Sequence, residues 1–254
     1  MKTMYRLVVM MVVVVVVALL MTSVAVRASE MDDRITTSAQ KSYVFKTYLQ
    51  GDDIKVQSMD GVVTLTGTVS EEYHKSLAQE TVAGLPGVKS VDNRLEIKGA
   101  PPTANSDAWL RDKVKVTLLF HRSVSASTTE VDVKDGIVTL RGDAASQAQK
   151  ELTTEYAKDV EGVKDVNNEM TVTKTLKKKR TVGEKIDDAS ITAQVKMTLL
   201  YHRSTSALKT KVETNSGVVT LYGKASNVAE LDLATKLAND VNGVKGVKNR
   251  MTIK

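Results

Sequence analysis

The sequence contains no cysteine, only three prolines and few aromatic residues. Without cysteine the protein has no disulfides, thiolate metal ligands, iron–sulfur clusters, thiol catalysis or lipidated N-terminal cysteine. Because Phe, Trp and Tyr make up only 4% of the chain, any core must be built from small aliphatic side chains. The 14 glycines are too few for a collagen-like or low-complexity chain. A length of 254 residues therefore indicates one to three folded domains.

Signatures of catalysis and of metal binding are also missing. The three histidines, His74, His121 and His202, show no H-x-x-x-H or H-E-x-x-H spacing. No G-x-S-x-G nucleophile turn and no G-x-x-x-x-G-K-[ST] phosphate loop occurs. A Ser-His-Asp site stays open, because its members can be distant in sequence. We expect a protein that is not an enzyme and has no cofactor and no metal site.

One long hydrophobic run begins the chain. Lys2 and Arg6 precede an unbroken apolar stretch over residues 7–21, and small residues lead to Ala28. This layout predicts a secretory signal over residues 1–28, cleaved after Ala28, and hence a periplasmic protein. The alternative is an uncleaved inner-membrane anchor over residues 7–26, since spanning a bilayer takes roughly 20 apolar residues.

Three copies of one segment follow. D-G-x-V-T-L-x-G occupies residues 60–67 and 135–142, and its third copy, at 216–223, begins with serine. A second motif, G-V-K-x-V-x-N, follows each copy at residues 87–93, 162–168 and 243–249. The spacing between the two motifs is the same each time. The repeats define three units: unit one, residues 32–98; unit two, residues 107–173; and unit three, residues 188–254.

Each unit predicts the element order α-β-β-α-β. In unit two, Leu110, Val114 and Leu118 recur every four residues, as on one face of a helix; unit three has Ile191, Val195 and Leu199. Val- and Thr-rich strands flank the Asp-Gly or Ser-Gly turn. The fold class is therefore α+β, with two helices packed on one face of a three-stranded mixed sheet in each unit. We expect three separate cores.

Nine glycines recur at equivalent positions and are expected to serve turns and caps. The turn glycines should have positive φ: Gly61, Gly136 and Gly217. A second set ends the strand motif: Gly67, Gly142 and Gly223. A third set is expected to end the second helix in the left-handed conformation of a C-terminal cap: Gly87, Gly162 and Gly243.

The two motifs at this fixed spacing resemble the BON domain family of bacterial proteins. The resemblance covers all three units, although Tyr48–Gly51 replaces, in unit one, the His-Arg-Ser stretch of the other two. It implies a periplasmic protein of the osmotic and envelope stress response that binds phospholipid. The family has no established catalytic residues, so the resemblance assigns none here.

Charge is distributed unevenly along the chain. Unit one, counted with Glu30, has eight basic and eleven acidic residues, and unit two has nine and twelve. Residues 174–187 carry a net charge of +4, and unit three has ten basic and only five acidic residues. Within the connecting segment, four consecutive basic residues are candidates for binding anionic phospholipid: Lys177, Lys178, Lys179 and Arg180. The alternative is that they form a solvated linker.

A second candidate lipid site lies at the predicted end of the first helix. Leu118–Ser123 in unit two is echoed in unit three, where the candidate residues are Leu200, Tyr201, His202 and Arg203. An apolar tip followed by arginine fits the headgroup boundary of a membrane. The alternative is that these residues fill the core while the arginine interacts with the helix end.

The expected partner is thus an anionic phospholipid surface, bound mainly by the basic third of the chain. A protein-binding adaptor or scaffold, which engages envelope proteins through exposed sheet faces and edges, is the alternative function. Nucleic acid is not expected, because export removes the protein from it and stacking aromatics are scarce.

Overall fold

The computed structural model describes residues 30–99, 102–124, 128–173, 185–205 and 210–254. The predicted signal, residues 1–28, and the basic run Lys177–Arg180 lie outside these ranges. Within them, no helix combines the length and apolar character needed to cross a membrane.

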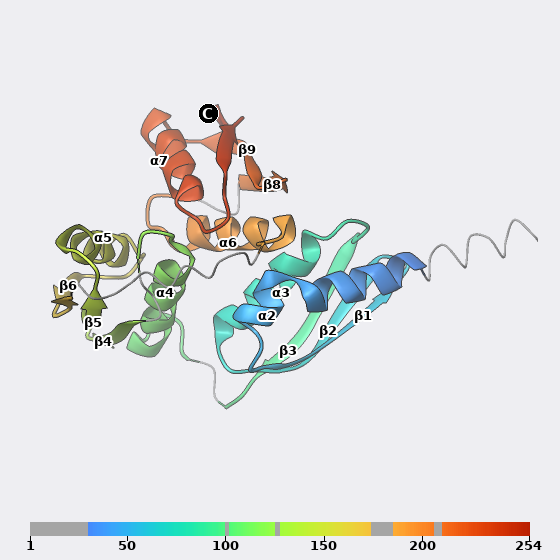
Figure 1. The fold of residues 1–254 in the computed structure, drawn as a ribbon, viewed down its shortest axis with the longest axis horizontal. Helices are drawn as coiled ribbons and strands as arrows, with labels where there is room; N and C mark the ends of the chain where they lie inside the picture. The colour runs from blue at the N-terminus through green and yellow to red at the C-terminus, as the bar shows by residue number, and fades with distance from the viewer. Residues whose placement is uncertain (1–29, 100–101, 125–127, 174–184, 206–209) are drawn as a thin grey trace, which may run out of the picture.

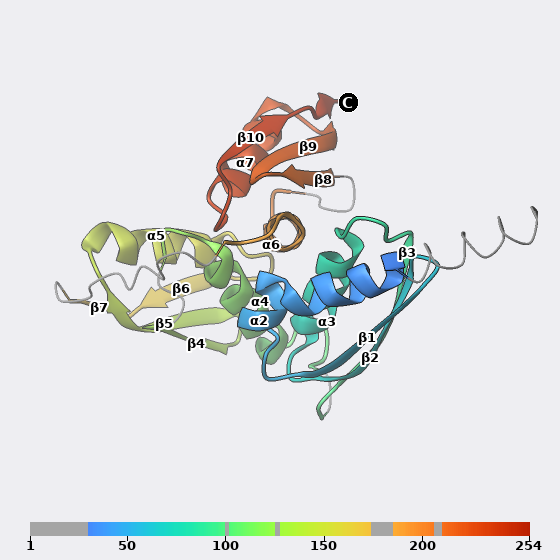
Figure 2. The same cartoon turned by 45° about the vertical axis from the view of Figure 1, so that its right-hand side comes forward.

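All three units have the predicted order of helices and strands (Figures 1 and 2). Unit one comprises a helix over residues 30–41, α2 (Tyr43–Thr47), β1 (Asp53–Met59), β2 (Val62–Val69), α3 (Glu72–Ala83) and β3 (Ser90–Ile97). Unit two comprises α4 (Asp107–Phe120), β4 (Thr129–Lys134), β5 (Ile137–Ala144), α5 (Gln147–Lys158), β6 (Asp165–Asn168) and β7 (Thr171–Val172). Unit three comprises α6 (Asp188–Tyr201), β8 (Thr210–Asn215), β9 (Val218–Ala225), α7 (Val228–Asn239), β10 (Gly246–Asn249) and β11 (Thr252–Ile253). The predicted α+β class is confirmed.

The sheet of each unit is mixed, as expected. Its central strand, β2, β5 or β9, runs antiparallel to the strand before it and parallel to the last strand. In units two and three the last strand is interrupted after Asn168 and after Asn249. The side chain of this asparagine accepts the N–H two residues further on in all three units: Asn93 from Leu95 at 3.2 Å, Asn168 from Met170 at 2.9 Å and Asn249 from Met251 at 2.9 Å. The Asn168 amide also donates to the Lys150 carbonyl, at 2.9 Å. The last residue of the second motif therefore ties the third strand to the second helix.

The hairpin turns confirm the prediction for the turn glycines. Their φ angles are 81° at Gly61, 81° at Gly136 and 82° at Gly217. The residues before them are also left-handed, with φ of 53° at Asp60, 54° at Asp135 and 52° at Ser216. Two successive positive φ angles are typical of the type I′ turn, which matches the twist of a two-stranded ribbon.

An aspartate at the start of the first helix anchors each turn. In unit two, Asp107 accepts the N–H of Asp135 at 2.7 Å and the N–H of Gly136 at 2.9 Å. Asp32 and Asp188 make the equivalent bonds in the other units. These carboxylates satisfy turn N–H groups that the ladder leaves unpaired, and they link the first helix to the far end of the hairpin.

The cap prediction for the third glycine set is wrong about where the helix ends. Gly87, Gly162 and Gly243 do have positive φ, of 90°, 97° and 86°. However, α3, α5 and α7 end four residues earlier, and their C-caps, Gly84, Asp159 and Asp240, are right-handed. Glycine is needed instead where the chain turns back past the first helix. A Cβ atom on Gly87 would lie 2.8 Å from the sulfur of Met31, and one on Gly243 would lie 3.1 Å from Ile191.

Helix α6 lies between all three units (Figures 1 and 2). Ile191, Val195 and Leu199 face the core of unit three. A second stripe on the same helix enters the core of unit one: Ala189, Ala193 and Met197. Helix α4 adds Val116 and Phe120 to that same core. The expectation of three separate cores is therefore wrong for unit one, whose core is completed by helices of the other two units.

Two turn glycines with the same φ are expected to differ in their tolerance of alanine. Both Gly61→Ala and Gly136→Ala pay the cost of a left-handed residue, roughly 1–2 kcal/mol. At Gly61 the new Cβ would also lie 2.6 Å from the Gly87 carbonyl oxygen, whereas at Gly136 it meets only the flexible Lys164 side chain, at 3.1 Å. Urea unfolding should show the larger loss of stability for Gly61→Ala. Equal losses would contradict the close backbone approach at this turn.

Candidate functional site

The tips of α4 and α6, where lipid contact was expected, lie at the contact between units two and three. His121, after α4, forms an antiparallel bridge with Val241 of unit three. His202, after α6, forms the matching bridge with Val160 of unit two. Each tip therefore docks on the loop that follows the second helix of the other unit, and the two contacts are reciprocal.

The arginines of the tips bind backbone carbonyls of the opposite unit. Arg122 donates to the carbonyls of Val241, at 3.0 Å, and Val244, at 2.8 Å. Arg203 donates, through longer bonds, to the carbonyls of Val160, at 3.4 Å, and Val163, at 3.3 Å. A guanidinium thus binds carbonyls of the loop after α7 or α5, which lie beyond the last helical turn. The expected interaction with a helix end exists, but the helix belongs to the neighbouring unit.

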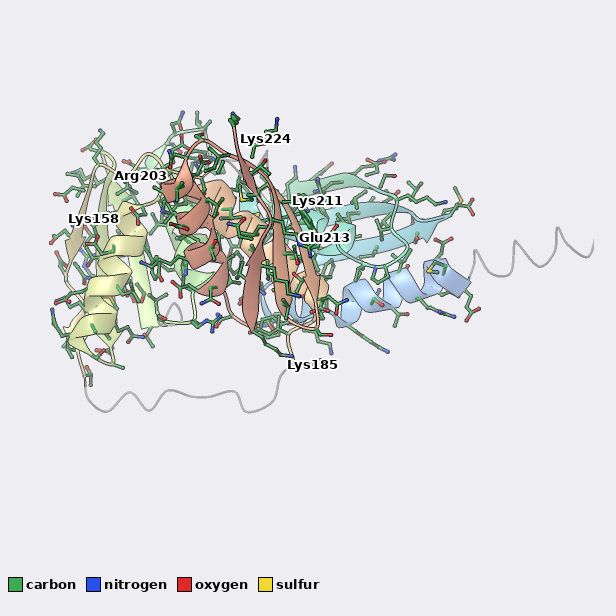
Figure 3. All side chains as sticks on the ribbon, turned by 90° about the horizontal axis from the view of Figure 1, so that it is seen from above. Lys158, Lys185, Arg203, Lys211, Glu213 and Lys224 are labelled. Atoms are coloured by element: carbon green, nitrogen blue, oxygen red, sulfur yellow. The ribbon has the colours of Figure 1, made fainter. Side chains whose placement is uncertain are left out.

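The apolar tip residues have intramolecular partners as well. Phe120 is part of the core of unit one, and Tyr201 packs against it. His202 is only 7% exposed, whereas Leu200 is 39% exposed and Arg203 keeps an exposed surface (Figure 3). Lipid contact through His202 would require units two and three to separate, and contact through Tyr201 would require unit three to leave the core of unit one.

His121 is buried in the contact between the two units. Its ring stacks on Tyr156, with 3.7 Å between the ring centroids, and both ring nitrogens lack a hydrogen-bond partner. Tyr156 donates its hydroxyl to Asp240 of unit three, at 2.7 Å. Burial lowers the pKa of His121 to about 4, against the opposing attraction of Asp240, and nearby His202 lowers it further. The imidazole is neutral at neutral pH.

His202 is the equivalent residue on the other side of the contact. Its Nδ1 accepts the N–H of Ser204 at 3.1 Å, which is possible only for an unprotonated nitrogen. Its Nε2 lies 3.6 Å from a carboxylate oxygen of Asp159. Burial lowers the pKa of His202, although Asp159 opposes the shift, and Arg203 lowers it further. Both histidines therefore favour the docked arrangement when they are neutral.

The basic residues of unit three gather on the outer face of its sheet. Val212, Val219 and Leu221 point into the core, so the residues that alternate with them face solvent. The outward residues of the strands include Lys211, Glu213, Tyr222, Lys224 and Lys248, and Figure 3 labels three of them. Arg250, which is also exposed, lies between β10 and β11. Lys211 lies 2.7 Å from Glu213, and this bond lowers the pKa of the carboxyl group.

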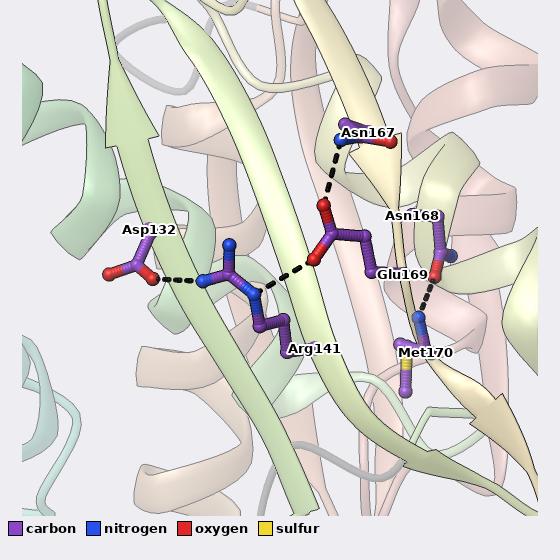
Figure 4. A network of polar contacts seen from close by, with 6 residues as sticks. All are labelled: Asp132, Arg141, Asn167, Asn168, Glu169 and Met170. Atoms are coloured by element: carbon purple, nitrogen blue, oxygen red, sulfur yellow. Dashed lines mark hydrogen bonds and ion pairs between the residues drawn. The ribbon is translucent and has the colours of Figure 1, made fainter.

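The same face of unit two is acidic (Figure 4). There Arg141 lies between two carboxylates, 2.6 Å from Asp132 and 2.9 Å from Glu169. Asn167 donates to the other oxygen of Glu169, at 3.0 Å. By the repeat, four residues of unit two stand where unit three has basic ones: Glu130 for Lys211, Asp143 for Lys224, Asn167 for Lys248 and Glu169 for Arg250.

The sequence places the excess basic charge in unit three but does not show that it lies on one face. The alternation of buried and exposed residues along the strands is the signal that would have placed it there. The other predicted basic group, Lys177–Arg180, lies outside the described residues.

One Ser-His-Asp group exists, in unit one, but it lacks the geometry of a catalytic triad. Asp52 lies 2.5 Å from Nδ1 of His74, and Ser70 lies 3.3 Å from the same nitrogen. A triad needs the serine on one ring nitrogen and the carboxylate on the other. Ser70 instead donates to Asp52, at 2.9 Å, and the group ties β1 to the start of α3. Burial lowers the pKa of His74 despite its partner.

Metal binding also finds no support in the residues that the structure describes. Among them, no three His, Asp or Glu side chains converge closely enough to hold an ion. The strongest chemical features are therefore the charged face of unit three and the buried contact between units two and three.

Acid should weaken the docked arrangement through His121. The pKa of His121 is lower in the folded state than the ordinary value of 6.5. Below pH 6.5 the histidine is therefore protonated in the unfolded chain but stays neutral in the folded chain. Stability contributed by His121 is complete above pH 6.5 and is lost as the pH falls towards 4, by about 1.4 kcal/mol per pH unit.

The measurement is urea unfolding between pH 7.5 and 4.5, compared with His121→Phe, which keeps a ring over Tyr156 but does not titrate. The variant should lose less stability than the wild type over this range. Parallel pH profiles would contradict the assignment to His121.

Comparison with known proteins gives a consistent result for all three units. The model of the BON domain matches residues 31–99, 106–174 and 187–254. The chain is 35% identical over 148 residues to osmotically-inducible protein Y of Escherichia coli (strain K12), which covers 58% of this chain and 73% of that protein.

A second relative and one solved structure extend the comparison. The chain is 32% identical over 113 residues to outer membrane lipoprotein DolP of Haemophilus influenzae, covering 44% of this chain and 56% of that protein. A structure of CdsD, a structural protein of the type III secretion system of Chlamydia trachomatis, aligns over 87% of this chain and 90% of that one, at 16% identity and a TM-score of 0.24. That score is too low to support an inference. The motifs, the fold and the match over all three units show that the chain belongs to the BON domain family.

Proposed function

We propose that this chain is a non-enzymatic periplasmic protein of the envelope stress response, which binds anionic phospholipid surfaces through unit three. The signal-like residues 1–28 support export. The names of the two relatives, an osmotically-inducible protein and an outer membrane lipoprotein, support a role in the envelope under osmotic stress.

The observation that carries the lipid proposal is the opposite charge of two equivalent sheet faces. Units two and three share their fold and their buried strand residues, yet Glu130, Asp143 and Glu169 are replaced by Lys211, Lys224 and Arg250. The exposed face of unit three can approach a layer of phosphate headgroups, which attracts each nearby basic residue by about 1 kcal/mol. The same face of unit two would be repelled. The difference lies in charge, because the fold is the same.

The mode of binding that this surface supports is adsorption and not insertion. Its outward side chains are mainly Lys, Arg, Thr and Tyr, with the carboxylate of Glu213 among them. Electrostatic adsorption weakens with salt, because the Debye length falls from about 10 Å at 0.1 M to about 3 Å at 1 M. Insertion of Leu200 and Tyr201 would depend little on salt, since it rests on apolar burial.

Replacing the basic face by the residues that unit two carries should abolish binding. The variant is Lys211→Glu, Lys224→Asp, Lys248→Asn and Arg250→Glu, all of which the same fold accommodates in unit two. In a flotation assay with phosphatidylglycerol vesicles at low salt, wild type should float with the vesicles and the variant should not. Loss of four contacts of about 1 kcal/mol each would weaken binding roughly a thousandfold.

The matched control is the reverse exchange in unit two: Glu130→Lys, Asp143→Lys, Asn167→Lys and Glu169→Arg. It should bind more tightly than wild type and should also release the vesicles as salt is raised. Neutral phosphatidylcholine vesicles should bind none of these proteins. Unchanged flotation of the first variant would refute a site on this face, and failure of wild type to float would refute lipid binding itself.

A further inference from the structure

A groove runs between units one and three, with α6 as its floor. One wall is α3, whose residues Ser76, Gln79, Glu80 and Ala83 follow one helical stripe along it. The other wall is β8, from residue 211 to residue 215. Two cavities of about 310 and 510 Å³ make up the groove, and they meet at Lys196.

The wall formed by β8 is a strand edge, and over residues 211–215 no second described strand pairs with it. Among the described strands, β8 pairs with β9 alone. Asn215 and Val218 flank the two-residue turn and form a hydrogen-bonded pair, so the pairs at Glu213 and Lys211 are bonded too, because bonded and non-bonded pairs alternate. Val212 and Thr214 therefore direct their N–H and C=O groups away from β9. These groups find no partner in the described part of the chain.

A strand edge that faces a helix across a groove suits an extended polypeptide. Main-chain donors and acceptors supply the affinity in strand addition, and cavities for alternate side chains supply the selectivity. Five residues of β8 extend over roughly 17 Å, enough to pair with a short segment. We propose that this groove binds an extended segment of another protein, which adds as a strand to β8.

The lining indicates the chemistry of that segment. The 310 Å³ cavity contains Met197 and Leu200, and the 39% exposure of Leu200 leaves a large apolar side chain open to an incoming one. The 510 Å³ cavity has small or polar residues, among them Ala83 and Thr192. The segment therefore carries an apolar residue at one end and small polar residues at the other.

The charges in the groove point to a neutral occupant. Lys196, on the floor of the groove, lies 2.6 Å from Glu80 and is paired with that carboxylate. A phosphate or a strongly acidic peptide would have to break this pair. The groove therefore differs in chemistry from the basic outer face of the same sheet.

The equivalent edge in unit two has a different lining. The cavity beside β4 measures about 240 Å³ and is lined by Tyr73, Leu118 and Leu119. The helix α3 therefore contributes a tyrosine beside β4, whereas beside β8 it contributes smaller polar residues such as Ser76 and Gln79.

A proline at position 214 tests the outer edge of β8 and leaves its hydrogen bonds to β9 in place. Thr214→Pro removes an N–H that β9 does not use, and proline is tolerated at such edge positions. The matched control, Thr214→Val, keeps this N–H and, like proline, removes the hydroxyl that accepts from Thr192 at 2.7 Å. Ala83→Arg obstructs the groove from the opposite wall without changing β8. Val133→Pro makes the same strand change on β4, at the position equivalent to Thr214.

The probe is a phage-displayed library of random peptides of about nine residues, a length that spans the groove with flanking residues. It is selected on the chain from residue 29 onwards, and an enriched peptide is then synthesised with blocked ends. Fluorescence anisotropy measures its binding to each variant, and circular dichroism verifies that each variant is folded.

Thr214→Pro and Ala83→Arg should weaken binding by roughly tenfold or more, whereas Thr214→Val and Val133→Pro should bind as wild type does. All four should still float with phosphatidylglycerol vesicles, because they leave the basic face unchanged. The proposal is overturned if the library yields no enriched sequence. It is also overturned if the selected peptide binds Thr214→Pro and Ala83→Arg as tightly as it binds wild type.

Discussion

Helix α6 must be covered on nearly every side, and the arrangement of the three units follows from this. Ten of its fourteen residues are buried. Six of the ten are apolar and form two stripes, so the helix would expose one apolar stripe to water if it packed on a single core. The cores of units one and three cover these two stripes. Even the start of the helix is held, since the side chains of Asp187 and Ser190 accept N–H groups of Tyr43 and Val44 in unit one.

The contact between units two and three leaves more buried polar atoms without hydrogen-bond partners than the apolar contacts with unit one do. The buried polar atoms that lack a partner within the described chain belong to α4, α6 and their tips: Thr117, His121, Gln194, Thr198 and His202. A buried polar group without a partner costs about 1–3 kcal/mol. The reciprocal backbone bonds and the arginine caps offset part of this cost. Among the contacts of the three units, this is therefore the one most sensitive to protonation.

The local fold was predictable because it depends on short-range chemistry. The strand Val62–Val69 and the turn at Gly61 follow from a Val/Thr pattern and an Asp-Gly pair. The stripe Ile191, Val195 and Leu199 was likewise visible at helical spacing. The second stripe of α6 was not, because alanine and methionine at Ala189, Ala193 and Met197 do not distinguish a buried face from an exposed one. The shared core and the role of the tips could therefore not be predicted.

Both proposed binding surfaces are formed by residues whose identity the fold of a unit does not constrain. Buried strand residues agree between units two and three, as Leu140 and Leu221 do, because the core tolerates few changes. Outward residues on the same strands have opposite charges, which the fold neither requires nor forbids. The groove beside β8 differs from the cavity beside β4 in another way: the repeat determines the strand, but the residues that α3 places beside each strand edge are different. Equivalent units thus acquire different surfaces. The basic face of unit three results from substitution of exposed residues, whereas the groove beside β8 results from the position of unit three next to unit one.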